Sequence, residues 1–296
     1  MKIPIVSVKT SDKLELYGIL LEAPKKDAVI INIHGTADNF YDNEFIWEIA
    51  RSVAPLNISM LSVNNRGSYG LEFYDYGPDV YRNSGASTEI FEKCLNDIDA
   101  WIKYALKLGY KKIILQGHSL GTEKISYYMG NGKYRNKVAV AILLGFSDSY
   151  GTHFAHWKKM APKLLDEAKT LIKQGKKDQF LTRRWLAHAG VLPQSAESFF
   201  NFFGPQSELA KALPLRQGKN LINFQKIKVP ILGVISDGEE FTIIPVKEAI
   251  ELLQNENKRA EIYQIKNCDH NFTGKEKELG KLVKGFLGKR LSRSPR

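Results

Sequence analysis

Along most of the chain, short runs of continuous apolar residues alternate with longer amphipathic runs. Residues 28–33 and 138–144 are apolar without alternation, as in strands that are buried on both faces of a sheet. The pattern predicts strands at 3–9, 14–21, 28–33, 58–63, 112–116, 138–144, 230–236 and 260–265. The amphipathic runs predict helices at 44–53, 87–108, 120–129, 246–254 and 275–286. Alternating strands and helices imply an α/β fold, with a mostly parallel sheet covered on both faces.

The alternation stops between residues 146 and 228. Helices are predicted there at 162–174, 180–189 and 196–203, without a strand. We therefore predict a core domain of residues 1–145 and 229–296, with residues 146–228 inserted as a helical lid, or cap, over one end of the sheet. Ordinary connecting helices would give the same pattern, so that alternative stays open.

The composition suits one large domain better than two independent ones, since the chain has 296 residues, 43% hydrophobic and 25% charged. Cys94 and Cys268 are far apart in the sequence, which indicates a reducing compartment rather than a disulfide framework. No apolar run approaches the roughly 20 residues that span a bilayer, and the first residues lack the apolar region of a signal peptide. We expect no membrane span and a cytoplasmic location, and the oligomeric state stays open.

The net charge of +11 is the unusual feature of the composition. A basic surface can be a solvated surface without a partner, or it can attract anionic substrates, nucleic acid or anionic lipid. No helix-turn-helix, zinc-finger or RNA-recognition signature accompanies the charge. No nucleic-acid partner is therefore expected.

A candidate nucleophile stands between the strand predicted at 112–116 and the helix predicted at 120–129. Gly117-His118-Ser119-Leu120-Gly121 fits the pattern G-x-S-x-G, and a strand before it and a helix after it are the context that this motif requires. On such a tight turn the serine hydroxyl stands at the helix N-terminus, where charge developing on a substrate oxygen is stabilised. Small residues are needed on both sides because the turn brings its neighbours close together.

A serine nucleophile needs a base, and the sequence offers six histidines. The side chain of His118 should point away from the neighbouring hydroxyl, and we place it with Gly35 beside the substrate. His153 and His156 have the spacing of a metal pair, but no third ligand accompanies them, so no metal is expected. His270 follows the last predicted strand and precedes the last helix, so its loop can return over the nucleophile. His270 is therefore the candidate base.

These motifs resemble the α/β-hydrolase superfamily over about residues 10–288. His34-Gly35-Thr36 resembles the family's His-Gly loop, Asn65-Arg66-Gly67 its Asp-x-Arg-Gly turn with Asn in place of Asp, and Asp269-His270-Asn271-Phe272 its catalytic-histidine loop. The resemblance implies an α/β-hydrolase fold with an eight-stranded sheet, and an oxyanion hole made by the backbone N–H groups of Thr36 and Leu120. Residues 193–199 and the phenylalanines after them resemble a branch that includes fungal siderophore esterases, from which no substrate follows.

The acid of the triad is open between two residues that follow the strand predicted at 230–236. In the family the strand opens with Pro and the acid lies nine places later, which from Pro230 gives Glu239. Asp237 lies two positions earlier and is the commoner residue type for this role. We favour Glu239 and keep Asp237 as the alternative.

The sequence thus predicts a serine esterase that forms a covalent acyl-enzyme with a Ser-His-acid triad. It needs no cofactor, and its partner is a small-molecule ester of anionic or apolar character. An acyltransferase or a serine peptidase would use the same residues, and a ligand-binding protein of this fold without turnover is a further alternative. Trp157, Trp185 and the phenylalanines at 199–203 could line an apolar substrate pocket or form the core of the insertion.

Overall fold

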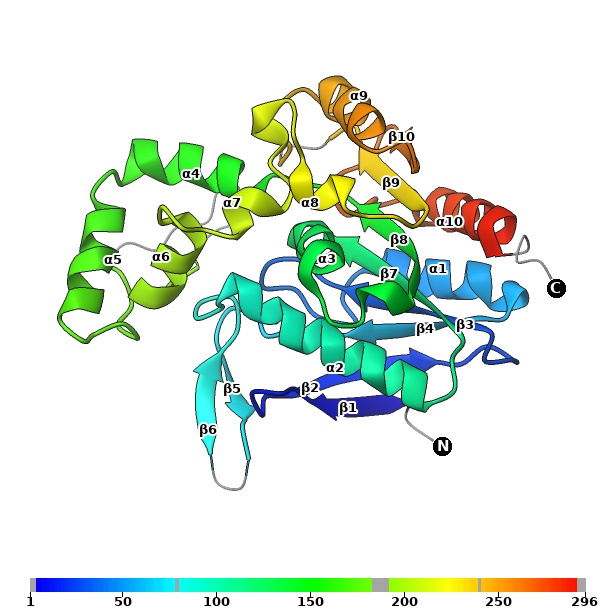
Figure 1. Cartoon of the computed structure of the whole chain (residues 1–296), viewed down its shortest axis with the longest axis horizontal. Coiled ribbons are helices and arrows are strands. Elements are labelled where there is room, and N and C mark those ends of the chain that lie inside the picture. Colours follow the sequence, from blue (N-terminus) through cyan, green and yellow to red (C-terminus); the bar gives the residue numbers. More distant parts are fainter. Residues whose placement is uncertain (1–3, 78–79, 183–191, 239–240, 292–296) are drawn as a thin grey trace.

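The computed structural model describes residues 4–77, 80–182, 192–238 and 241–291. Its strands are β1 Ile5–Lys9, β2 Glu15–Leu21, β3 Ala28–Ile33, β4 Ile58–Val63, β5 Glu72–Asp75, β6 Tyr81–Ser84, β7 Lys112–His118, β8 Val138–Leu144, β9 Ile231–Ser236 and β10 Ala260–Ile265. Eight of them form one sheet in the order β1-β2-β4-β3-β7-β8-β9-β10 (Figure 1). β2 pairs antiparallel with β1 and β4, and the other neighbours are parallel. The predicted fold is confirmed.

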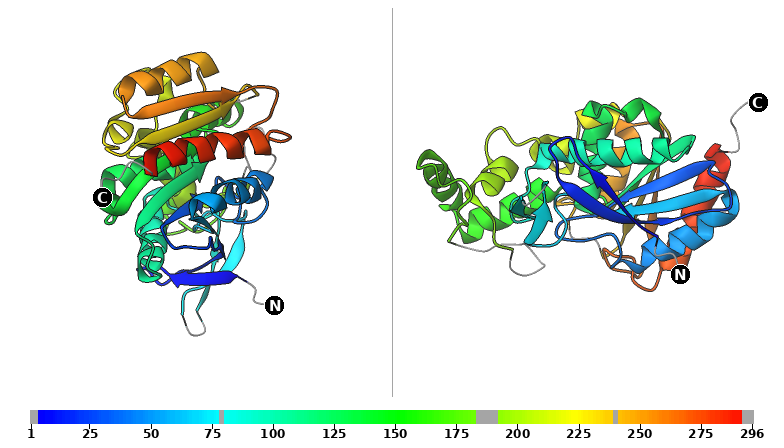
Figure 2. Two further views of the ribbon diagram at one scale, coloured as in Figure 1. Left: turned by 90° about the vertical axis from the view of Figure 1, so that its right-hand side faces the viewer. Right: turned by 90° about the horizontal axis from the view of Figure 1, so that it is seen from below.

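Helices cover both faces of this sheet. The helices of the core are α1 Glu44–Val53, α2 Cys94–Lys107, α3 Leu120–Asn131, α9 Val246–Glu256 and α10 Glu276–Leu291, with 3₁₀ turns at Ala54–Leu56, Phe91–Lys93 and Arg135–Lys137. A further 3₁₀ turn, Leu215–Gln217, lies between β8 and β9. One apolar cluster joins α1 and α10 to the sheet, and a second joins α2, α3 and α9 to its other face. The right-hand view of Figure 2 shows the strands between α1 and α10 on one side and α2 and α3 on the other. No helix in the described ranges is long and apolar enough to cross a bilayer.

The prediction of one helix over 87–108 is wrong at its start, because α2 begins at Cys94. The backbone of Ser87 is engaged in tertiary hydrogen bonds instead: its N–H donates to Gly70 O (2.9 Å) and its carbonyl accepts from Ser195 N (2.9 Å). These bonds tie the turn at residues 85–88 to the core on one side and to the segment before α6 on the other.

The antiparallel pair β5 and β6 was not predicted from the sequence. Each strand has only four residues, and β6 reads Tyr-Arg-Asn-Ser without an apolar run. Hydrophobic patterning therefore gives no signal for this ribbon.

Of the helices that follow β8, α4 Ser149–Met160, α5 Leu164–Lys173, α6 Ala196–Phe203 and α7 Leu209–Ala212 lie to one side of the sheet (Figure 1). α8 Ile222–Gln225 packs on α3 instead, and its Phe224 belongs to the apolar cluster over that face of the sheet. α5 and α6 coincide with predicted helices, whereas α4 was not predicted. The helix predicted at 180–189 lies mostly outside the described residues, and at its start Phe180 forms a β-bridge with Ser195. The division into a core and a lid stays a prediction.

A third apolar cluster joins these helices to the core. From the helices it includes Trp157, Phe199 and Phe203, and from the core it includes Phe91 and Leu120. Because Leu120 follows the candidate nucleophile directly, the cluster packs the helices against the end of the sheet that carries Ser119.

Candidate active site

Ser119 occupies a strained turn between β7 and α3. Its φ of 54° and ψ of −128° are rare for a residue with a side chain. A Cβ at Gly117 would overlap the carbonyl oxygen of Gly121, and a Cβ at Gly121 would overlap that of Ile33. The two glycines of the motif are therefore required by close backbone approach, and together they allow the turn that presents Ser119.

The loop after β3 passes directly against the candidate nucleophile. A Cβ at Gly35 would lie only 2.8 Å from Cβ of Ser119, so only glycine fits there. Thr36 follows in this loop and Leu120 opens α3. Their backbone N–H groups thus belong to the two segments that adjoin the serine, although their role as an oxyanion hole stays a prediction.

Ser119 and His270 line the same cavity, which has a volume of about 460 Å³ and which we call the wide pocket. Its lining residues are Gly35, Thr36, Ala37, Asp38, Asp42, Asn43, His118, Ser119, Ser149, His153, Phe241, His270 and Asn271. The structure therefore brings together all the predicted site residues that it describes, except Asp237 and Leu120.

The His270 ring contacts two other rings. The ring centroids of His118 and Phe241 each lie 4.8 Å from that of His270. His118 Nε2 donates to the backbone carbonyl of His270 (3.0 Å), since a carbonyl can only accept. Burial, followed by the electrostatic effect of the neighbouring His270 ring, lowers the pKa of His118 to about 4. His118 is therefore neutral near pH 7 and supports the loop of the candidate base.

Of the two candidate acids, only Asp237 is among the residues that the structure describes. Glu239 lies outside the described residues. The Asp237 carboxylate is exposed and accepts from the backbone N–H of Cys268 (3.3 Å). The backbone N–H of Asn267 and then that of Cys268 lower the pKa of Asp237. Asp237 thus holds the backbone just before His270.

His34 supports the loop that carries Gly35 and Thr36. Its Nδ1 donates to Gly35 O (2.8 Å), so Nε2 is the acceptor for the N–H of Asn65 (3.2 Å). Burial, and then the charge of Lys124, lower the pKa of His34 to about 3. The neutral imidazole therefore ties the loop after β3 to the turn after β4.

Several residues of the wide pocket were missed in the sequence. Asp38 and Asp42 are joined through Asn39, whose N–H donates to Asp38 (2.8 Å) and whose side-chain amide donates to Asp42 (2.5 Å). Burial raises the pKa of Asp38. Asp38 and Asp42 come shortly after the His-Gly-Thr motif in the sequence, and this closeness is the only signal that could have predicted them as pocket residues. Among the described residues that line the pocket there is no Lys or Arg, so the basic charge of the chain lies elsewhere.

Ser149 is fixed at the pocket by a buried acid on α3. Glu123 accepts hydrogen bonds from Ser147 Oγ (3.0 Å), from Ser149 N (3.0 Å) and from Ser149 Oγ. Burial, and then the charge of Asp148, raise the pKa of Glu123 to about 8. Glu123 thereby connects the helix after Ser119 to the first turn of α4.

A second cavity, which we call the narrow pocket, continues from the wide pocket past Thr36, Ser149 and His153, which line both. Its lining residues are Thr36, Ala86, Glu89, Leu120, Ser149, His153, Leu192, Gln194, Phe202, Phe203 and Leu209. α4, α6 and the first residue of α7 form one wall, and the core forms the other.

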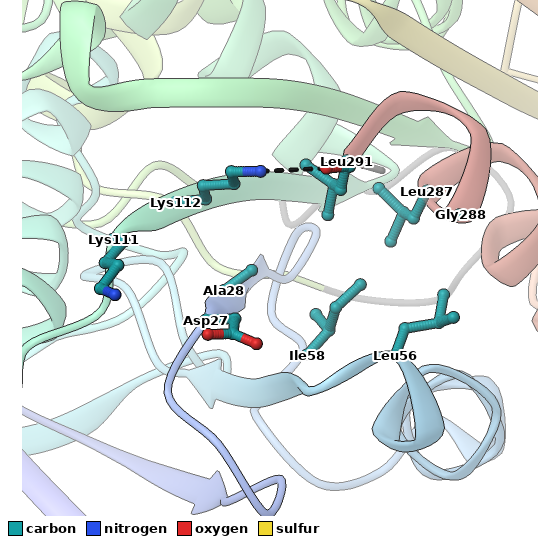
Figure 3. A pocket seen from close by; sticks show the side chains of 9 residues that line it. All are labelled: Asp27, Ala28, Leu56, Ile58, Lys111, Lys112, Leu287, Gly288 and Leu291. Atoms are coloured by element: carbon teal, nitrogen blue, oxygen red, sulfur yellow. Dashed lines mark hydrogen bonds between the residues drawn. The ribbon is translucent and has the colours of Figure 1, made fainter. Parts of the chain in front are cut away.

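A cavity of about 380 Å³ lies at the other end of the sheet, where β3, β4 and β7 begin (Figure 3). Apolar side chains of Leu56, Ile58 and Leu287 line it together with Asp27 and Lys112, and Lys112 Nζ donates to Leu291 O (3.1 Å). The length of the strands separates this cavity from Ser119. Among the described residues that line it there is neither a serine nor a histidine.

The described ranges contain no group of three His, Cys, Asp or Glu side chains placed to hold a metal ion. His153 lines both pockets, whereas His156, one turn later on α4, lines neither of them. These two histidines therefore do not line either of the two pockets together.

A family model described as "Protein of unknown function (DUF1749)" matches residues 13–285. The chain belongs to the DUF1749 family. No curated protein matches this DUF1749 member.

Solved structures resemble this DUF1749 member over nearly its whole length. Est1E from Butyrivibrio proteoclasticus, determined with ferulic acid bound, is 16% identical with a TM-score of 0.65, covering 97% of this chain and 100% of its own. An esterase of Pyrococcus furiosus, Pf2001, is 16% identical with a TM-score of 0.60, covering 98% of this chain and 91% of its own. A soluble variant of monoglyceride lipase from Saccharomyces cerevisiae, in complex with a substrate analog, is 14% identical with a TM-score of 0.67, covering 98% and 96%. These likenesses confirm the α/β-hydrolase fold.

Proposed function

We propose that this DUF1749 member is a serine esterase with Ser119 as nucleophile and His270 as general base. The observation that carries the proposal is that a serine on a strained strand-to-helix turn and a histidine from a distant loop line one pocket. The structural neighbours described as esterases and as a lipase support an ester as the bond that is cleaved.

In the proposed reaction, Ser119 Oγ attacks the ester carbonyl carbon and His270 takes the hydroxyl proton. The backbone N–H groups of Thr36 and Leu120 stabilise the oxyanion that forms. His270 then gives its proton to the leaving alcohol, and the acyl group stays on Ser119. A water molecule, deprotonated by His270, releases the acid and restores the serine.

The proposed acid is Glu239, because the hydrogen bonds of Asp237 go to the backbone before His270. In this assignment the Glu239 carboxylate keeps the imidazole in its productive tautomer and stabilises the imidazolium. Asp237 holds the loop that carries the base.

Hydrolysis of p-nitrophenyl acetate, together with labelling by a fluorophosphonate, tests the proposal. We expect turnover, and mass spectrometry should place the phosphonate on Ser119. Ser119→Ala should lose both, with a fall in kcat of about a million-fold. Ser126→Ala is the matched control, because the Ser126 hydroxyl on the same helix donates to Thr122 O (2.8 Å) and does not line the wide pocket. Full activity of folded Ser119→Ala would exclude the proposal.

A further inference from the structure

If the proposed function holds, each of the two pockets binds one half of the ester substrate. His270 must protonate the leaving alcohol, and it lines the wide pocket but not the narrow one. Leu120, whose N–H is assigned to the oxyanion, lines the narrow pocket instead. The alcohol half therefore belongs in the wide pocket and the acyl half in the narrow pocket.

The narrow pocket admits only a short acyl chain. Its cavity volume is about 20 Å³, against about 460 Å³ for the wide pocket, so a long acyl chain has no room between its walls. Phe202 and Phe203 line it, with their ring centroids 6.1 Å apart and Phe203 only 1% exposed. Rings packed in this way cannot give way without disturbing the apolar cluster that holds α6 against the core.

Gln194 places a polar group in this apolar pocket, although it is only 3% exposed. Its backbone carbonyl is anchored by the N–H of Leu181 (2.9 Å). The single hydroxyl proton of Ser198 goes to Glu89 O (2.7 Å), so Ser198 Oγ can only accept from Gln194 Nε2 (3.3 Å). This fixes the orientation of the amide. Gln194 Oε1 is then a buried acceptor that receives no hydrogen bond within the described residues.

Glu89 adds a second acceptor to the lining. The Lys124 ammonium lies 2.6 Å from its Oε1, and both residues are almost fully buried. Apart from this ion pair, neither carboxylate oxygen receives a hydrogen bond from the described part of the chain. The negative charge is already balanced, so an added ammonium group would meet the positive charge of Lys124 without a new counter-ion.

We propose that the narrow pocket selects a short acyl group that carries a hydroxyl. A buried acceptor without a donor is costly, and a substrate hydroxyl that donates to Gln194 Oε1 removes this cost. The apolar walls hold the carbon chain, and the neutral hydroxyl suits a pocket in which the carboxylate is already paired. The preferred substrate of this esterase is thus a short-chain hydroxyacyl ester.

The test compares p-nitrophenyl esters of butyrate, 3-hydroxybutyrate, 3-aminobutyrate and octanoate. We expect kcat/KM for at least one enantiomer of the hydroxybutyrate to exceed that of the butyrate about tenfold, as one hydrogen bond to a buried acceptor allows. The octanoate should be the poorest substrate. Gln194→Met should bring the ratio of hydroxybutyrate to butyrate close to one. Gln254→Met is the matched control, because Gln254 is exposed on α9, and it should keep the tenfold ratio.

Equal values for butyrate and both enantiomers of hydroxybutyrate would overturn the inference, as would a faster reaction of the aminobutyrate or the octanoate. This comparison uses the unaltered protein, so it decides the question even if Gln194→Met does not fold. If none of the four esters is hydrolysed and Ser119 is not labelled by a fluorophosphonate, the proposed function itself fails. The two failures are therefore distinguishable.

Discussion

Gly145 makes room for the imidazole of His270. A Cβ atom at Gly145 would lie 3.0 Å from Cε1 and 3.1 Å from Nδ1 of the ring. Gly145 follows β8 with a φ of +54°, and its N–H donates to Val234 O (2.8 Å). The end of β8 is thus fixed by the sheet, and a larger residue there would have to displace the ring.

Gly145→Ala should lower kcat on p-nitrophenyl acetate by about ten- to a hundredfold, because a small displacement of the base is costly. The variant should also lose about 1 kcal/mol of stability from its positive φ. Gly109→Ala is the control, since Gly109 has a φ of +93° and its Cβ would meet nothing within 4 Å. It should lose stability but keep kcat. An equal kcat for Gly145→Ala and the unaltered protein would show that His270 is not confined by β8.

The assignment of the acid predicts unequal effects of two substitutions. Glu239→Gln keeps the shape of the side chain but loses the charge that stabilises the imidazolium, so kcat should fall about ten thousand-fold. Asp237→Asn can still accept from the backbone at Cys268 and should change kcat by less than about tenfold. Steady-state kinetics of both variants and of the double variant measure this. The opposite order of effects would give the role to Asp237.

The buried ion pair of Lys124 and Glu89 predicts a large effect on stability. Lys124→Met leaves a carboxylate buried without its counter-ion, and the free energy of unfolding should fall by about 3–5 kcal/mol. Adding Glu89→Gln removes that charge and should restore part of the loss. Urea denaturation of the single and double variants gives these values.

An exposed pair provides the comparison for this experiment. Lys177 and Glu197 lie 2.9 Å apart with side chains 53% and 41% exposed. Lys177→Met should therefore cost less than about 1 kcal/mol. Similar losses for Lys124→Met and Lys177→Met would contradict the expected effect of burial.

Glu123 predicts a dependence of stability on pH. Its pKa is raised to about 8 in the folded protein, first by burial, from an ordinary value of 4.5. Between these values the folded state keeps a proton that the unfolded state loses, so the free energy of unfolding should fall as pH rises, by about 1 kcal/mol per pH unit. Glu123→Gln cannot ionise and should lack this contribution. Parallel curves for the two proteins from pH 5 to 8, by urea denaturation, would refute it.

The strands, helices and turns that could be predicted from the sequence are those that depend on local patterns. The bounds predicted for β3, β4, β8, β10, α1 and α6 match the structure. The turn at Ser119 was predictable because its requirement for small neighbours is met within five consecutive residues. By contrast, the start of α2 depends on hydrogen bonds that join Ser87 to Gly70 and Ser195, and no local pattern contains them.

The lining of the candidate site was less predictable than the positions of Ser119 and His270 in it. Ser149 reaches the pocket because Glu123, on another helix, accepts its N–H and hydroxyl. Gln194 is a pocket residue because Leu181 and Ser198 hold its backbone and amide. Such positions follow from tertiary contacts, which no local pattern in the sequence contains.

The apolar cluster that Trp157 and Phe199 share with Phe91 and Leu120 also bears on how the protein opens. A rigid-body movement of the helices after β8 away from the core would expose these side chains to water. We therefore expect slow amide exchange in α6 to follow the same opening event as that in α3, as one cooperative unit. A substitution in this cluster should therefore change the stability of the core as well as that of the helices after β8.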